Sequence, residues 1–82
     1  MTIKFEVMTK TGSHSIECDL SKEVEVIDGI EVRRQIAQVR LDDVEVDAYS
    51  RIKLGDSWLP WVDVDWTHTA KSLRDVAEFW AN

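Results

Sequence analysis

Apolar and charged residues alternate along most of the first two thirds of the chain, and this alternation predicts β-strands. Ile3, Phe5 and Val7 alternate with charged neighbours, and a second alternating run covers residues 14–20. Successive side chains of a strand point to opposite faces, so each run has one face for a core and one for solvent. Further runs lie at residues 24–27, 30–32, 39–41, 44–47 and 49–54. The pattern predicts about five or six strands within residues 2–66.

Short polar segments separate these runs and predict turns. Asp28-Gly29 lies between two apolar runs, and this dipeptide favours a type I′ hairpin turn because both positions tolerate a positive φ. Lys10–Ser13, Asp42-Asp43 and Gly55-Asp56 are further turn candidates. We expect Ser21-Lys22 to join the first hairpin to the second.

Residues 33–41 fit neither the helical nor the strand period cleanly. Helical spacing would place Arg33 among apolar neighbours, whereas Val39 and Leu41 alternate with Arg40. We interpret the segment as a strand with a bulge or bend near Arg33–Gln35, and a helix is the alternative.

The C-terminal segment changes to the period of a helix, with apolar residues at i, i+3, i+4 and i+7: Leu73, Val76, Ala77 and Trp80. Thr69 or Ser72 can serve as the N-cap, so we expect a helix over about residues 69–81. A helix of this length is marginal alone in water and has to pack on the sheet. We expect it to pack through Leu73, Val76 and Trp80 against Val62, Val64 and Trp66.

Residues 57–66 hold three of the four tryptophans. Alternation places Trp58, Pro60, Val62, Val64 and Trp66 on one face, which we expect to join the core. The other face carries Leu59, Trp61, Asp63 and Asp65, a composition that suits a contact surface. Proline cannot donate a ladder hydrogen bond, so we expect this strand at a sheet edge, at least as far as Pro60.

Together these elements predict an α+β fold in a single domain covering residues 1–82. The expected architecture is an antiparallel, meander-like sheet of about five or six strands, with one C-terminal helix packed on one face. A chain of 82 residues is short, so we expect a small core and no deep cleft.

The net charge of −6 narrows the classes of partner. Binding to nucleic acid or to anionic lipid depends on Lys and Arg, so an acidic chain is a poor direct ligand for either. The charge favours a protein partner with a basic surface, or serves solubility alone.

Cys18 is the only cysteine, which excludes an intramolecular disulfide. The N-terminal residues show no signal peptide, and no apolar run approaches the ~20 residues of a membrane span. We therefore expect the cytoplasm, including a host cytoplasm if the gene is viral.

Motifs for metal binding and catalysis are absent. His14 and His68 have no Cys or His partner at ligand spacing, and we expect His14 to be packed or at a strand end and His68 to be solvated. Asp63-Val64-Asp65 is too short a pattern to indicate a metal site. Neither a catalytic triad nor a glycine-rich phosphate loop is present. We expect a non-enzymatic protein without metal or cofactor.

The distribution of acids suggests a recognition surface. Asp43, Glu45 and Asp47 would form a row along one strand, and Asp63 and Asp65 would repeat it beside Trp61. Such a surface could steer a basic partner and anchor it through Trp61 and Leu59. Alternatively, the acids are only the solvated face of a sheet.

The first functional hypothesis is therefore an inhibitor or adaptor acting by protein–protein contact. Small acidic proteins that mimic DNA, including phage anti-defence inhibitors, are similar in size and charge, a similarity of composition alone. A second hypothesis is an oligomer, formed through an exposed strand edge, that binds a small anionic ligand or nucleotide between subunits through Arg33, Arg34 and Arg40. A third is a structural subunit of a larger assembly.

Overall fold

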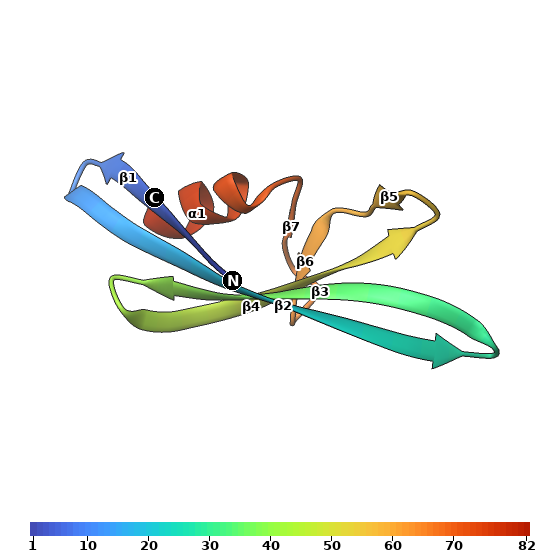
Figure 1. Cartoon of the computed structure of the whole chain (residues 1–82). Helices are drawn as coiled ribbons and strands as arrows, with labels where there is room; N and C mark the ends of the chain where they lie inside the picture. Colours follow the sequence, from blue (N-terminus) through green and yellow to red (C-terminus); the bar gives the residue numbers. More distant parts are fainter.

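The alternating runs build one curved antiparallel sheet, followed by a single helix. The computed structural model describes all 82 residues. In chain order the elements are β1 (Thr2–Thr9), β2 (Gly12–Ile27), β3 (Ile30–Leu41), β4 (Val44–Leu54), β5 (Ser57–Trp58), β6 (Trp61–Asp63), β7 (Thr69–Ala70) and α1 (Leu73–Ala81) (Figure 1). The predicted α+β class is confirmed, and the sheet has seven strands because it includes the two-residue β5 and β7.

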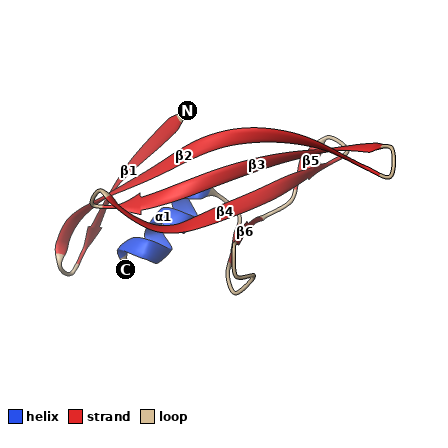
Figure 2. Ribbon diagram, turned by 90° about the horizontal axis from the view of Figure 1, so that it is seen from below, coloured by secondary structure: helices blue, strands red, loops and turns tan.

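The strands are joined almost entirely in sequence order, as a meander. The order across the sheet is β1-β2-β3-β4-β6-β7, with β5 paired to β4, and every pair is antiparallel. The three longest strands, β2, β3 and β4, run side by side along the length of the molecule (Figure 2). The result is a curled, elongated half-barrel of 49 × 22 × 20 Å.

The tight turns follow from local sequence. Asp28 and Gly29 have φ of 51° and 78°, and Ile27 pairs with Ile30, which confirms the predicted type I′ turn. Asp42 and Asp43 also have positive φ and form the next hairpin turn.

Two interruptions of the strands that the sequence predicted are not found where they were expected. No break occurs at Ser21-Lys22, because β2 runs through these residues and is shared by the first two hairpins. Residues 33–41 are strand as interpreted, but the register shift lies between Val39 and Arg40. These residues pair with Asp47 and Glu45, which leaves Val46 as the extra residue of a bulge in β4.

The core lies on the concave face, under α1. Ten apolar residues are buried there: Val7, Ile16, Cys18, Ala37, Val39, Tyr49, Trp61, Ala70, Val76 and Ala77. Figure 1 shows α1 over one half of the sheet only, while the other half, toward the β2–β3 turn, has no helix above it. Every residue from 21 to 30 is exposed in that uncovered half.

The helix begins where its capping residue predicts. The Ser72 hydroxyl accepts a hydrogen bond from the Asp75 backbone N–H at 3.2 Å, so Ser72 is the N-cap and the start expected at residue 69 is wrong. Trp80 Nε1 donates to the Tyr49 hydroxyl at 3.1 Å and ties the last turn of α1 to β4.

The helix does not pack on the residues that the sequence suggested. It contacts β1, β2 and β7, with Val76 and Ala77 buried. Val64 and Trp66 are largely exposed, because β6 ends at Asp63 and the chain then leaves the sheet. No helix of the molecule has the length and apolar character needed to cross a lipid bilayer.

We expect Trp61 and Trp66 to differ sharply in their effect on stability. Trp61 is 2 % exposed, so Trp61→Ala lowers the free energy of unfolding by about 3–5 kcal/mol through the lost burial and the cavity. Trp66 is 81 % exposed, so Trp66→Ala changes it by no more than about 0.5 kcal/mol. Urea unfolding of both variants measures this, and equal effects would contradict the burial described here.

We expect Cys18 to be unreactive in the native protein. The side chain is fully buried, and burial, followed by the neighbouring Asp19 charge, raises the pKa of its thiol to about 11. Only the thiolate reacts with thiol reagents, so labelling requires an opening of the sheet. The labelling rate, followed with a chromogenic disulfide, should rise in parallel with unfolding in urea. Complete labelling within seconds without denaturant would disprove the burial.

Candidate interaction surface around Trp66

The alternation in β6 is opposite to the one that the sequence predicted. Trp61 and Asp63 are 2 % and 7 % exposed, whereas Val62 is only half-buried. Asp63 pairs with the buried Tyr49, so both point into the concave face. The chain is not in a strand at residues 59–60, and this break resets the alternation between β5 and β6. The prediction that Trp61 and Asp63 face solvent as a partner-binding pair is therefore wrong.

The buried Asp63 carboxylate holds the loop that follows β6. Its two oxygens accept hydrogen bonds from the backbone N–H and the hydroxyl of Thr67, both at 2.8 Å. The Asp63 carbonyl accepts a third from the Trp66 backbone N–H at 3.1 Å. Burial acts to raise the pKa of Asp63, but the bonds from Thr67 and the His68 backbone outweigh it and lower the pKa. Asp63 therefore stays ionised and fixes this turn.

Trp66 is presented to solvent by this turn. Its φ is 62°, in the left-handed region that costs a bulky side chain about 1–2 kcal/mol, and the indole is 81 % exposed. The hydrogen bonds to Asp63 offset the strain. The loop projects beyond the edge of β4, as Figure 2 shows from below. A strained backbone that holds a large apolar group in water is typical of a functional position.

Apolar side chains surround Trp66 on the convex side of the sheet. A recess of about 120 Å³ is lined by Ser50, Arg51, Ile52, Leu59, Pro60, Val62 and Trp66. Val64 is 60 % exposed in the same loop as Trp66. We name the apolar members of this group, Ile52, Leu59, Pro60, Val62, Val64 and Trp66, the Trp66 surface. Of the predicted contact residues, Leu59 belongs to it and Asp65 is exposed in its loop.

The predicted row of acids is not formed. The bulge at Val46 places Glu45 opposite Arg40 but Asp47 opposite the buried Val39, so these two acids point to different faces. Asp43 lies in the hairpin turn. The acids therefore do not form the row that the sequence predicted, and this part of the site prediction is wrong.

The three arginines of the anionic-ligand hypothesis separate into two groups. Arg40 forms ion pairs with Glu17 at 2.5 Å and Asp19 at 2.6 Å, and the hydrogen bond to Glu17 raises its pKa. Arg33 and Arg34 instead line a groove in the uncovered half of the sheet. Arg40 is therefore removed from that candidate site. Arg33 points into the groove, whereas Arg34, paired across the strands with Glu23 and Ile52, points to the opposite face, so the structure does not bring the three arginines together.

The histidines have structural contacts. His14 contacts the Thr11 hydroxyl at 2.7 Å and the Asp42 carboxylate at 2.8 Å, linking two turns from a strand end as predicted. His68 is not solvated as expected, because its ring stacks on Phe79 with centroids 4.0 Å apart. No group of three or more His, Cys, Asp or Glu side chains is placed to hold a metal ion.

Sequence reasoning missed Trp66 because it carried one alternation through residues 57–66. The available signals were Pro60, which interrupts the ladder, and the spacing of Asp63 and Thr67, which suits a side chain bonding to its own loop. Comparisons of the chain with protein-family models, with curated proteins and with solved structures find no match. The role of the Trp66 surface is therefore inferred from the exposure, the backbone conformation and the neighbours of its residues.

We expect Asp63 to control the order of this loop. Asp63→Asn keeps the size of the side chain but replaces the acceptor for one Thr67 bond with a donor, so the Thr67 amide should exchange faster with solvent. The folded pKa of Asp63 is lowered, so the stability it contributes is present above the ordinary Asp value of about 3.9 and is lost as pH falls through the folded pKa. NMR of the Thr67 amide measures both effects. The exposed Asp65→Asn is the control, and equal changes in the two variants would exclude this role.

Proposed function

We propose that the chain is a non-enzymatic binding protein, an adaptor or inhibitor, that contacts a protein partner through the Trp66 surface. The single observation that carries the proposal is the Trp66 indole, 81 % exposed on a backbone of positive φ that Asp63 holds in place. A chain whose core is this small gains nothing in its own stability from leaving an indole in water.

The energetics of association support this role. An aromatic side chain removes roughly 150–250 Å² from water when it is buried, which corresponds to about 4–6 kcal/mol of gross hydrophobic stabilisation. Trp is also among the residues most enriched at the centres of interfaces. Leu59, Pro60 and Val64 around it would exclude water from the contact.

Charge favours a partner with a basic rim. Asp65 is exposed beside Trp66, and the chain carries a net charge of −6. Association with a basic surface would be steered by this charge and weakened by salt. We propose the cytoplasm as the compartment, where the unpaired Cys18 stays reduced.

We expect Trp66→Ser to abolish recovery of the partner while leaving the protein folded. The experiment compares wild type, Trp66→Ser and Val44→Ser as baits in a lysate of the source organism. Val44 is 63 % exposed on β4, away from the Trp66 surface, and is the matched control. The partner should be recovered in stoichiometric amount with wild type and Val44→Ser only. Recovery that is the same with all three baits, or no stoichiometric partner at all, would contradict the proposal.

Light scattering of the purified protein distinguishes binding of a different protein from self-association through the Trp66 surface. A wild-type monomer is expected. A wild-type dimer that becomes a monomer in Trp66→Ser would mean that a second copy covers the Trp66 surface, and the adaptor or inhibitor role would then fail.

A further inference from the structure

A groove in the uncovered half of the sheet gathers positive charge in an acidic chain. Its volume is about 410 Å³, and it is lined by Lys22, Glu23, Val24, Glu31, Arg33, Arg34, Gln35, Lys53 and Trp58. Of its four bases, Lys22, Arg33 and Lys53 lie on the face of the groove together with one acid, Glu31, whereas Arg34 and Glu23 alternate to the opposite face. This face therefore has a local excess of positive charge, although the whole chain has a net charge of −6. Cross-strand pairing of Lys22 with Gln35 and of Arg33 with Lys53 places these groups on neighbouring strands.

Two of the four bases have no acidic partner. Arg33 pairs with Glu31 at 3.3 Å, and Arg34 pairs with Glu25 at 3.4 Å. Lys22 and Lys53 take part in none of the six ion pairs of the molecule. Their ammonium groups are free to bind an anion in the groove.

Gln35 supplies a neutral donor whose orientation is fixed. The side chain is 9 % exposed, and its Oε1 accepts a hydrogen bond from Arg51 Nε at 2.7 Å. Since a guanidinium can only donate, the amide oxygen has to face Arg51 and the amide NH₂ has to point elsewhere. No hydrogen bond from that NH₂ to the chain is present, and Gln35 lines the groove.

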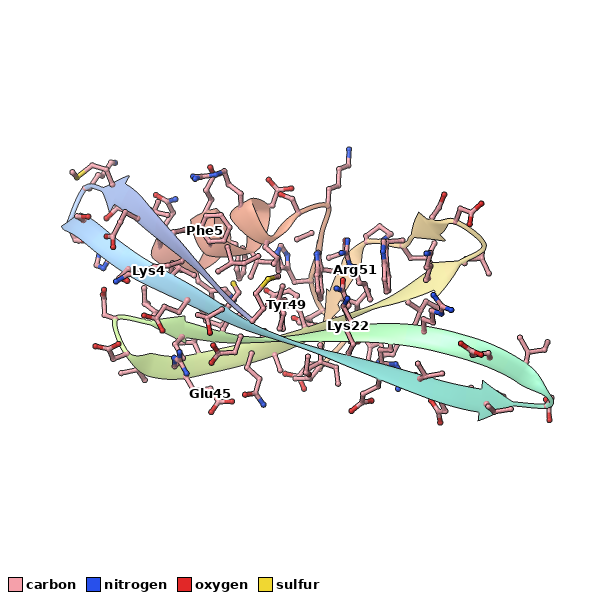
Figure 3. All side chains as sticks on the ribbon, viewed as in Figure 1. Lys4, Phe5, Lys22, Glu45, Tyr49 and Arg51 are labelled. Carbon is pink, nitrogen blue, oxygen red and sulfur yellow. The ribbon has the colours of Figure 1, made fainter.

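Arg51 is a positioning residue for this donor. Its guanidinium lies 4.6 Å from the ring centroids of both Trp58 and Trp61, between the two indoles. Figure 3 shows Arg51 on the same side of the sheet as Tyr49. Stacking on two rings restricts the side chain and so holds the Gln35 amide in one orientation.

We propose that this groove binds a phosphate group through Lys22, Lys53, Arg33 and the Gln35 amide. Phosphate carries a charge of about −1.5 to −2 at neutral pH and three acceptor oxygens, which suits several bases and one NH₂ donor better than a single carboxylate does. The groove and the Trp66 surface lie on opposite faces of the sheet, so the two proposals are independent.

The test is an NMR titration with inorganic phosphate, and in parallel with a phosphoserine peptide and its unphosphorylated form, at physiological salt. Saturable shifts of the Gln35 side-chain NH₂ and the Trp58 indole N–H are expected. Lys53→Gln should weaken binding roughly two- to fivefold. Gln35→Glu should abolish it, because a carboxylate replaces the donor while it still accepts from Arg51 and preserves the fold.

Lys10→Gln and Trp66→Ala are the controls and should bind like wild type. Lys10 matches the charge change of Lys53→Gln at an exposed site outside the groove. Tighter binding of inorganic phosphate would identify a small ligand, and tighter binding of the phosphopeptide a modified protein segment. Absence of saturable shifts with every probe would overturn the proposal, as would equal affinity of wild type, Lys53→Gln and Gln35→Glu.

Discussion

Burial of Trp61 is the constraint on which both faces of the molecule depend. With its indole on the concave face, Trp61 fixes the alternation of β6, and Asp63 two residues later has to point inward as well. A buried carboxylate has to be hydrogen-bonded, and the groups that bond Asp63 belong to the following loop. The loop closes on Asp63, and Trp66 is turned outward. The exposed indole is thus a consequence of the buried one.

The elements that the sequence predicted correctly are those set by local chemistry. Asp28-Gly29 favours its turn through the φ values of two residues. Ser72, one of the two N-caps that the sequence offered, accepts a hydrogen bond from the backbone N–H of Asp75, three residues later. The face of the sheet toward which β6 buries its residues is not determined by local chemistry of this kind. It depends on how the chain re-enters the sheet after Pro60, which no spacing within residues 57–66 reveals.

The bulge at Val46 shows the same limit for the candidate site. In the sequence, Glu45 and Asp47 alternate as cleanly as any pair, and their separation onto two faces appears only when β4 is paired with β3. A bulge is defined by the pairing of two strands, so the sequence of β4 alone could not show that its row of acids would be interrupted. Leu59 and Asp65 are exposed as predicted, and both lie outside the strands.

The same inward alternation serves two purposes along the length of the sheet. Under α1, inward positions of β2 and β3 hold Ile16, Cys18, Ala37 and Val39, which are fully buried. Farther along the same strands they hold Lys22, Arg33 and Gln35, where no helix covers the sheet. An apolar residue at those positions would lie in water, whereas a long base can cover the sheet with its stem and keep its charge solvated. The end of helix coverage is therefore the physical boundary between the core and the groove, and on β3 the inward residues change there from Val39 and Ala37 to Gln35 and Arg33.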